Sequence, residues 1–303
     1  MPSRRGALAA VGAAGALGAA AWGIGVERYL FTVRSHVARV LAPGSAPIRV
    51  LHLSDIHMAP WQHRKQRWIA RLRSLRPDLV IDTGDNLGHA DGLAGVRAAL
   101  SPFAGTPGVQ VHGSNDIWMP APRNPFRYFL GPSSRQPSAP RQDVEALDRF
   151  LGDDLGWFDL NNAAVSFDIR GQRLRFLGTD DPHHDLDDWS ALDASAATMA
   201  DGGLSIGVTH APYRRVLDGF VDRGADMIFA GHTHGGQVRV PGVGALVANC
   251  DLPLRQTRGL SVWEHDGRRV PLNVSAGLGH SIYAPVRFAC RPEASLITLA
   301  PRR

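Results

Sequence analysis

Cysteine is almost absent from this chain of 303 residues, which contains only Cys250 and Cys290. The two lie far apart in sequence and neither belongs to a Cys-x-x-Cys pair, so the pattern indicates no zinc ribbon and no disulfide framework. Two free buried thiols and a single bridge are both compatible with this composition. The sequence also contains no internal repeat.

Compact runs of lysine and arginine are absent too, although the chain is basic. Its 33 Lys+Arg exceed its 28 Asp+Glu, which gives a net charge of +5 and a pI near 9.8. This balance favours anionic partners such as phosphorylated ligands or lipid headgroups. Because a basic run and a pattern of stacking aromatics are both missing, we expect no nucleic-acid partner. With 44% apolar and 20% charged residues, the chain is globular and can bury one large core or two small ones.

Charge is missing altogether from residues 6–26, an Ala/Gly-rich run that follows Arg4 and Arg5. The run is long enough to cross a bilayer, but alanine and glycine make it only weakly hydrophobic. It suits an export signal at least as well as a permanent anchor, and the three alanines at 19–21 offer an A-x-A cleavage site. The arginine pair resembles a twin-arginine leader. A soluble Ala-rich helix is the alternative, although no polar face interrupts the run.

A linker of sequence Pro-Gly-Ser-Ala-Pro at 43–47 separates this segment from the rest. We therefore place an N-terminal segment with its linker at 1–47 and a folded domain at 48–303. In the domain, short apolar runs alternate with helical patterns, which is typical of an α/β fold. Polar residues of similar kinds follow five of the apolar runs, which are 48–53, 79–81, 109–111, 204–208 and 227–230.

The residues at these five ends are the candidate metal ligands. They are Asp55 and His57, then Asp85, then Asn115 and Asp116, then His210, and finally His232 and His234. The carboxyl ends of strands in open α/β sheets converge on one crevice, so we expect these side chains to lie close together. Oxygen and imidazole ligands without thiolates suit Mn, Fe or Zn. Their number exceeds the needs of one ion and predicts a carboxylate-bridged pair, which clamps phosphoryl oxygens and activates a water. Taken singly, each residue could be a cap or turn former.

In this order the motifs resemble those of the calcineurin-like metallophosphoesterases, from Ile48 to the C-terminus. The matching motifs are Asp55-Ile-His57, Gly84-Asp85-Asn86, the block 113–116, the lone His210 and Gly231-His-Thr-His234. The resemblance implies an α/β fold of two facing β-sheets flanked by helices, a four-layer sandwich. It also implies a first metal held by Asp55, His57, Asp85 and His234. Asp85 would bridge to a second metal, held as well by an Asn, His210 and His232.

One block departs from the family pattern. The usual Gly-Asn-His-Asp is here Gly113-Ser114-Asn115-Asp116, so an ungapped alignment puts Ser114 at the ligand position. A serine hydroxyl is a poorer ligand than an amide carbonyl, and we therefore expect a one-residue slip that lets Asn115 bind metal. The block supplies no histidine as general acid, so His183 or His184 substitutes, or the leaving group departs without such a proton. The predicted catalytic set is Asp55, Asp85, Asn115, Asp116 and His210.

The resemblance implies a hydrolase of phosphate esters or pyrophosphate bonds that uses two divalent ions (Mn, Fe or Zn) and a hydroxide bridging them. The segments 234–237 and 277–293 are similar to a bacterial, membrane-associated branch with phospholipid-like or sugar-nucleotide-lipid substrates. We expect an anionic phosphorylated substrate, lipid-linked ones included, for a monomer that meets the membrane through its N-terminal segment. We place it at the bacterial cell membrane or exported, with the extracytoplasmic side favoured. The alternative is a degenerate metal-binding sensor of a ligand or lipid, with little turnover.

The Pro-rich loop 119–141 follows the strand end that carries Asn115. Its Arg123 and Arg127 bring planar donors suited to phosphate oxygens, and Tyr128 and Phe129 bring apolar or stacking surface. The loop is therefore either a substrate lid or an ordinary surface excursion.

Overall fold

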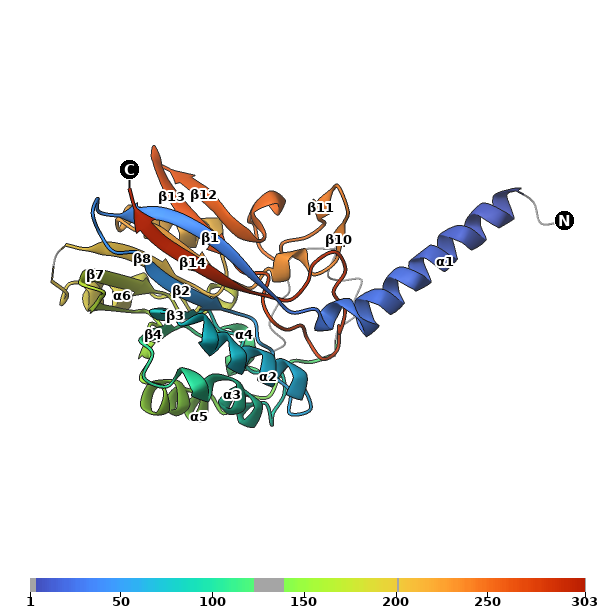
Figure 1. Ribbon diagram of the computed structural model, residues 1–303, viewed down its shortest axis with the longest axis horizontal. Helices are drawn as coiled ribbons and strands as arrows, with labels where there is room; N and C mark the ends of the chain where they lie inside the picture. The colour runs from blue at the N-terminus through green and yellow to red at the C-terminus, as the bar shows by residue number, and fades with distance from the viewer. Residues whose placement is uncertain (1–3, 123–138, 201, 303) are drawn as a thin grey trace.

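Two six-stranded β-sheets lie face to face at the centre of the computed structural model, which describes residues 4–122, 139–200 and 202–302 (Figure 1). The first sheet contains, in spatial order, β1 (Thr32–Leu41), β14 (Glu293–Pro301), β2 (Ile48–Leu53), β3 (Leu79–Asp82), β4 (Gly108–Gln110) and β5 (Phe158–Asp159). The second contains β12 (Gly259–His265), β13 (Arg268–Val274), β9 (Met227–Ala230), β8 (Leu204–Val208), β7 (Gln172–Gly178) and β6 (Ala163–Ile169). Both sheets mix parallel and antiparallel pairs.

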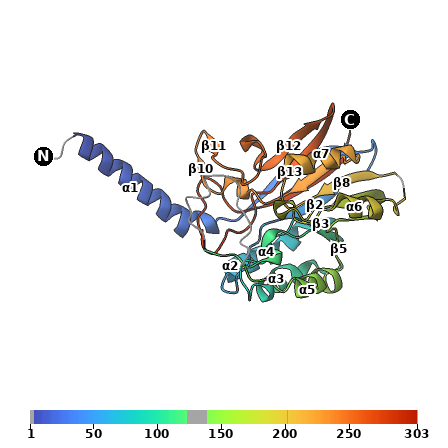
Figure 2. The ribbon, with the colours of Figure 1, turned by 180° about the vertical axis from the view of Figure 1, so that it is seen from behind.

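Helices cover the outer face of each sheet (Figures 1 and 2). Those against the first sheet are α2 (His63–Arg71), α3 (Leu93–Leu100) and α5 (Val144–Arg149), and those against the second are α6 (Trp189–Ala196) and α7 (Arg214–Asp222). Three apolar cores follow, one between the sheets and one under each helical layer. The arrangement is the predicted four-layer α/β sandwich, and that prediction is confirmed.

Alternation along the central strands explains why they appear in the sequence as unbroken apolar runs. On β9, Met227 and Phe229 belong to the core between the sheets, whereas Ile228 and Ala230 face the helices of the second sheet. Successive side chains of a strand point to opposite faces, and here both faces are covered, so every position is buried.

The first strand lies outside the expected domain. Residues 32–41 form β1, which pairs in parallel with β14 along its whole length and so belongs to the first sheet. The expected boundary after residue 47 therefore cuts through the chain of this sheet. The strand was missed because exposed and half-buried polar positions such as Arg34 and Arg39 interrupt its apolar pattern.

Helix α1 (Arg4–Gly25) projects away from the sandwich (Figures 1 and 2). None of the helices in the described residues is both long enough and apolar enough to span a bilayer. The roles of the run 6–26 as an export signal or as an anchor both stay predictions. Cys250 is half-buried and Cys290 buried, and both are free thiols, so the single-bridge alternative is wrong.

The loop after the third strand end is described only at its two ends. Trp118 pairs with Arg141 in an isolated antiparallel bridge, and the amide of Met119 donates to the carbonyl of Pro140 at 2.8 Å. Arg123, Arg127, Tyr128 and Phe129 lie outside the described residues. The choice between a lid and a surface excursion stays open.

Candidate metal centre

Strands β2 and β3 run parallel in one sheet, β8 and β9 run parallel in the other, and the predicted ligands occupy the loops that follow such strands. Five of them have left-handed backbones, namely Asp55, His57, Asp85, His232 and His234, with φ between 43° and 66°. A non-glycine residue in this conformation costs about 1 kcal/mol or more and persists only where its surroundings fix it. Such strain is typical of functional sites.

Glycines in these motifs allow the ligand loops to approach one another closely. A Cβ at Gly231 would lie 1.9 Å from Oγ of Ser54 and 2.7 Å from Oδ2 of Asp55. A Cβ at Gly113 would lie 2.4 Å from Oδ1 of Asp85. Any side chain at either position would displace a carboxylate of the site, which explains why both motifs contain glycine there.

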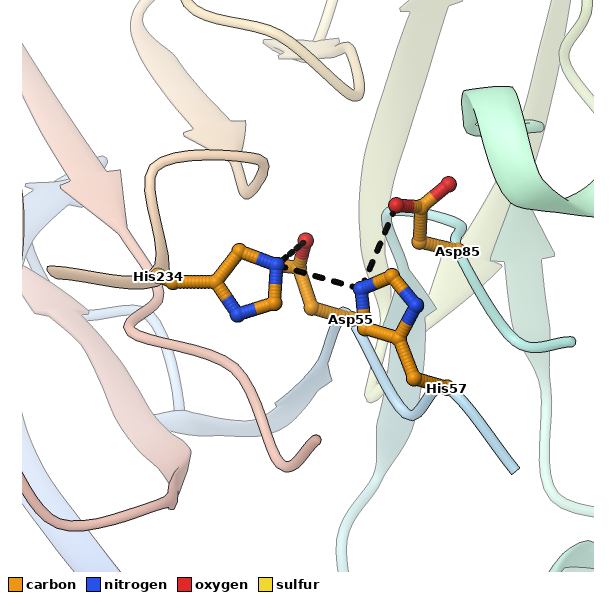
Figure 3. A group of neighbouring side chains, drawn as sticks. All are labelled: Asp55, His57, Asp85 and His234. Atoms are coloured by element: carbon orange, nitrogen blue, oxygen red, sulfur yellow. Dashed lines mark hydrogen bonds and ion pairs between the residues drawn. The ribbon is translucent and has the colours of Figure 1, made fainter. Parts of the chain in front are cut away.

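The first ligand group is Asp55, His57, Asp85 and His234, whose ligand atoms all lie within 4.8 Å of one another. Figure 3 shows the four side chains pointing toward a common centre. Nε2 of His57 lies 3.1 Å from Nε2 of His234 and 3.3 Å from Oδ2 of Asp85. Nε2 of His234 lies 3.5 Å from Oδ1 of Asp55. The predicted convergence of this group is confirmed, and it forms a buried Asp/His metal site.

Electrostatics in the first ligand group favour a bound cation. Burial, and then the charge of Lys65, holds the pKa of His57 well below its usual value, so the ring is neutral and keeps a lone pair for a metal. Burial also raises the pKa of Asp85 to about 7, with the charges of Asp55 and Asp116 adding to the effect of burial and that of His210 opposing it. A divalent ion among these groups would lower the pKa of the carboxylates and hold them ionised.

The second ligand group is Asp85, Asn115, His210 and His232, and it meets the first at Asp85. Nδ1 of His210 lies 2.7 Å from the carbonyl of Thr83, so Nδ1–H donates there and Nε2 faces Asp85. Burial lowers the pKa of His210, but the charges of Asp85, Asp55 and Asp181 raise it to about 9, so Nε2 carries a proton whose place a divalent ion would take. That Nε2 is buried, has no hydrogen-bond partner in the described part of the chain and lies 3.6 Å from Oδ2 of Asp85. An orphaned imidazole nitrogen beside a carboxylate fits a metal ligand. The ring of His232 lies 5.1 Å from that of His210.

The variant block 113–116 places its two candidate ligands differently. Asn115 contacts Asp85 twice. Its backbone amide donates to Oδ1 and its side-chain amide donates to Oδ2, both at 2.7 Å. Ser114 turns toward another loop, where its hydroxyl donates to Oδ2 of Asp181 at 2.7 Å and lies 3.1 Å from Nδ1 of His184. This placement favours Asn115 as the ligand, and the assignment stays a prediction.

The catalytic role predicted for Asp116 stays a prediction, and in the structure backbone amides surround its carboxylate. It is fully buried and accepts the amides of Asp85 and Asn86 at 2.7 Å, Gly113 at 3.0 Å and Leu87 at 3.1 Å. These bonds hold the loop that carries Asp85, so its position in the structure is that of a support for the ligands.

Several neighbours of the site carried no recognisable signal in the sequence. Nζ of Lys65 donates to the backbone carbonyls of Ile56 and His57, and so braces the first ligand loop. Asn249 contacts Nε2 of His232 through its carbonyl at 3.1 Å. Neither belongs to a motif, and only the folding of the loops around the ligands brings them here. The candidate proton donors His183 and His184 do lie at the site, since the ring of His183 is 4.4 Å from that of His232.

Comparison with known proteins gives a consistent result. The family model for calcineurin-like phosphoesterase matches residues 48–236, more than half of the chain. An uncharacterized protein YpbG of Bacillus subtilis (strain 168) is 24% identical over 94% of this chain and 96% of its own length. An uncharacterized metallophosphoesterase YkoQ of the same organism is 26% identical over 83% of each chain. A dimetal phosphatase structure from Danio rerio is 12% identical with a TM-score of 0.40, covering 77% of this chain and 88% of that chain.

Proposed function

Because this chain belongs to the calcineurin-like phosphoesterase family, we propose that it hydrolyses phosphate esters or pyrophosphate bonds with a pair of divalent ions. Family membership and the buried Asp/His site together make it a metal-dependent phosphoesterase. The observation that carries the proposal is the junction at Asp85, whose carboxylate neighbours ligands of both groups. Mn, Fe and Zn all suit this set of oxygen and imidazole donors.

The residues of the chain have separable roles in this reaction. The first ligand group and the second ligand group would each hold one ion, with Asp85 shared between them. When bound, such a pair supplies Lewis acidity and an activated water for in-line attack on phosphorus. The chain itself supplies three imidazole rings held neutral by burial, those of His57, His232 and His234. It also supplies the carboxylates of Asp55 and Asp85 in a largely dry surrounding, since both are buried.

We assign the proton for the leaving group to His184. Its Nδ1 lies 2.8 Å from Oδ2 of Asp181, and its ring packs 4.8 Å from that of Trp118, so orientation is fixed on two sides. Although burial alone would raise it, the hydrogen bond from His184 and the charge of His210 hold the pKa of Asp181 below its usual range. An ionised carboxylate behind an imidazole supports proton donation from the far nitrogen. His183 is the weaker candidate, because the partner of its Nδ1, the hydroxyl of Tyr213 at 2.9 Å, is neutral and supports a proton on the ring less than a carboxylate does.

We also propose that the substrate is an anionic phosphorylated molecule, with lipid-linked substrates favoured, and that the chain acts as a monomer at or beyond the bacterial cell membrane. The uncharged run 6–26, the net charge of +5 and the resemblance of 234–237 and 277–293 to a membrane-associated branch support this proposal.

Hydrolysis of p-nitrophenyl phosphate and bis-p-nitrophenyl phosphate with added Mn tests the reaction class. Turnover that disappears with a chelator and returns with Mn is the expected result. Metal binding without turnover of either compound would favour the alternative, a degenerate metal site that senses a ligand or lipid. The missing histidine in the block 113–116 is the observation that supports this alternative. A screen over phospholipids, nucleotides and sugar nucleotides then distinguishes the substrate classes.

A further inference from the structure

Arg287 is the largest fully buried side chain of the described residues, at 0% exposure. No carboxylate of the described part of the chain lies within ion-pair distance of its guanidinium. A buried charge without a carboxylate partner is costly unless its donors are satisfied by other acceptors. The position of this arginine therefore calls for a specific reason.

The guanidinium connects two loops of the metal centre. Nη1 donates to the carbonyl of His234 at 3.0 Å, and Nη2 lies 3.2 Å from Nδ1 of the same residue. On its other side, Nη2 donates to the carbonyl of Gly277 at 3.3 Å and Nε donates to that of Gly279 at 3.2 Å. Five fixed N–H donors in one plane suit arginine, and not lysine, for such a set of acceptors.

The turn 277–279 in turn seats Asp55. The amide of Gly279 donates to the carbonyl of Asp55 at 2.6 Å, and a Cβ at Gly277 would lie 2.5 Å from Cβ of Asp55. Arg287 therefore spans from the backbone carbonyl of His234 to the backbone support of Asp55. These are two members of the first ligand group, and they come from loops far apart in sequence.

The segment that carries Arg287 is itself held by Glu27, which lies just after the end of helix α1 at Gly25. Glu27 is 5% exposed, and its carboxylate accepts the amides of Cys290 at 2.7 Å and Ala289 at 3.0 Å. It also accepts the indole N–H of Trp22 at 2.9 Å. Ala289 has a left-handed backbone with φ of 49°, so this conformation depends on the support that Glu27 provides.

We propose that Arg287 is a positioning residue of the metal centre, and that Glu27 anchors the segment from which it acts. The fork of Arg287 fixes the backbone of His234 against the turn that seats Asp55, and Glu27, which follows α1, holds the segment from which it acts. The inference concerns the ligand geometry and rests on the metal centre, not on the substrate proposed above.

Positioning and charge predict opposite effects on metal affinity, which makes the inference testable. A guanidinium beside a cation site repels the cation, so removing its charge alone would tighten binding. Loss of positioning would weaken binding by about 10- to 100-fold, the usual effect of removing a support of a metal ligand. The sign of the change in Mn affinity therefore decides between them.

The experiment measures Mn affinity of the full chain by calorimetry, without substrate, for Arg287→Gln and Arg287→Lys. Both should bind Mn at least about 10-fold more weakly, because neither side chain reproduces the fork. Arg291→Gln is the matched control, since this exposed neighbour has no ion pair with described residues, and it should bind as the wild type does. Affinity within about twofold of the wild type, or tighter, in Arg287→Gln would overturn the proposal.

Glu27→Gln keeps the test decisive if the Arg287 variants fail to fold. Its amide oxygen can accept only part of what the carboxylate accepts from Ala289 and Cys290, so Mn affinity should fall by a smaller factor in the same direction. The absorption spectrum of bound Co²⁺ should also change, because it reports ligand geometry directly. An unchanged affinity and spectrum in folded Glu27→Gln would overturn the coupling to α1. Failure of the phosphoesterase assays would leave these metal-binding results untouched.

Discussion

The side chain of Asp85 lies between two sets of ligands, and this position makes it the strictest residue-scale test of the metal centre. Oδ2 is 3.3 Å from Nε2 of His57 in the first ligand group and 3.6 Å from Nε2 of His210 in the second. Among the described residues, it is the one predicted ligand whose carboxylate lies beside imidazole nitrogens of both groups.

Asp85→Asn is therefore expected to abolish turnover and to lower the metal content of the purified protein. A neutral amide supplies one oxygen and no charge where two ions need a shared anion, so activity should fall at least about 100-fold. Metal analysis and p-nitrophenyl phosphate hydrolysis measure the two effects. The assignment is wrong if the variant holds two metals and keeps more than a tenth of wild-type activity.

Ser114 and Asn115 form a matched pair, because they are adjacent in sequence but face different groups. Asn115→Ala should lose the second metal, since its side chain lies 2.7 Å from Asp85. Ser114→Ala should retain both metals, since its hydroxyl contacts Asp181 and His184. Metal analysis of both purified variants decides, and the opposite outcome would assign the ligand to Ser114.

His184→Asn tests the proposed proton donor by comparing substrates whose leaving groups differ in their need for a proton. The variant should lose about 10²-fold or more on alkyl phosphates, whose leaving groups need a proton, and much less on p-nitrophenyl phosphate. Ratios of kcat/KM for the two substrates measure this difference. His183→Asn serves as the control, and equal losses on both substrates in His184→Asn would argue for a structural role only.

At the scale of elements, the strand ends were predictable and the first strand was not. Residues 48–53 and 227–230 are buried on both faces, so their apolar character is continuous and easily recognised. Strand β1 mixes exposed and buried positions, and its partner β14 lies at the other end of the chain. A strand whose stability comes from such a distant partner leaves no local pattern.

His112, at the end of β4, makes a contact with α5 whose effect on stability depends on pH. Burial alone would lower its pKa, but the hydrogen bond and charge of Asp148, with Nε2 and Oδ1 2.7 Å apart, raise it to about 9. A folded pKa above the unfolded value of about 6.5 means that the contribution is complete below pH 6.5. It is lost as pH rises through about 9.

Asp148→Asn should therefore destabilise the protein at pH 6 and have little effect at pH 10. We expect about 1 kcal/mol, or roughly 2–3 °C in Tm, at the lower pH, because Asp148 is partly exposed and its ion pair is screened. Thermal unfolding of both proteins at the two pH values gives the comparison. A difference in Tm that is the same at pH 6 and pH 10 would contradict the assignment.

At the scale of the whole molecule, the site assembles because strand ends of two facing sheets meet. Convergence of Asp55, Asp85 and His234 followed from that rule, and the structure places them together. The rule says nothing about Arg287 or Glu27, which reach the site from loops and from the segment just after α1. Their role depends on side-chain geometry between segments more than two hundred residues apart, which no local spacing encodes.

The N-terminal helix provides the last prediction, because its two ends are in different environments. Leu17 is 72% exposed and a Cβ at Gly15 or Gly18 would meet nothing within 4 Å, whereas Gly23 is packed against the backbone of Arg287. Cleavage after the alanines at 19–21 would leave a chain that starts at Trp22. That chain keeps the indole bond to Glu27, at 2.9 Å, and the packing of Gly23 on Arg287, while residues 14–21 are largely exposed.

We expect the full chain, expressed in a bacterial host, to yield an exported form that begins at Trp22. Its Tm in chelator should lie within about 2 °C of that of the uncleaved chain, because exposed residues contribute little to stability. Intact mass and N-terminal sequencing of the exported fraction identify the cleavage site. Replacing the alanines at 19 and 21 with bulky residues should prevent cleavage, so that only the full-length chain is found. An uncleaved chain in every fraction of the wild type would instead support a permanent N-terminal helix, with its foot clamped on Glu27 as the structure describes.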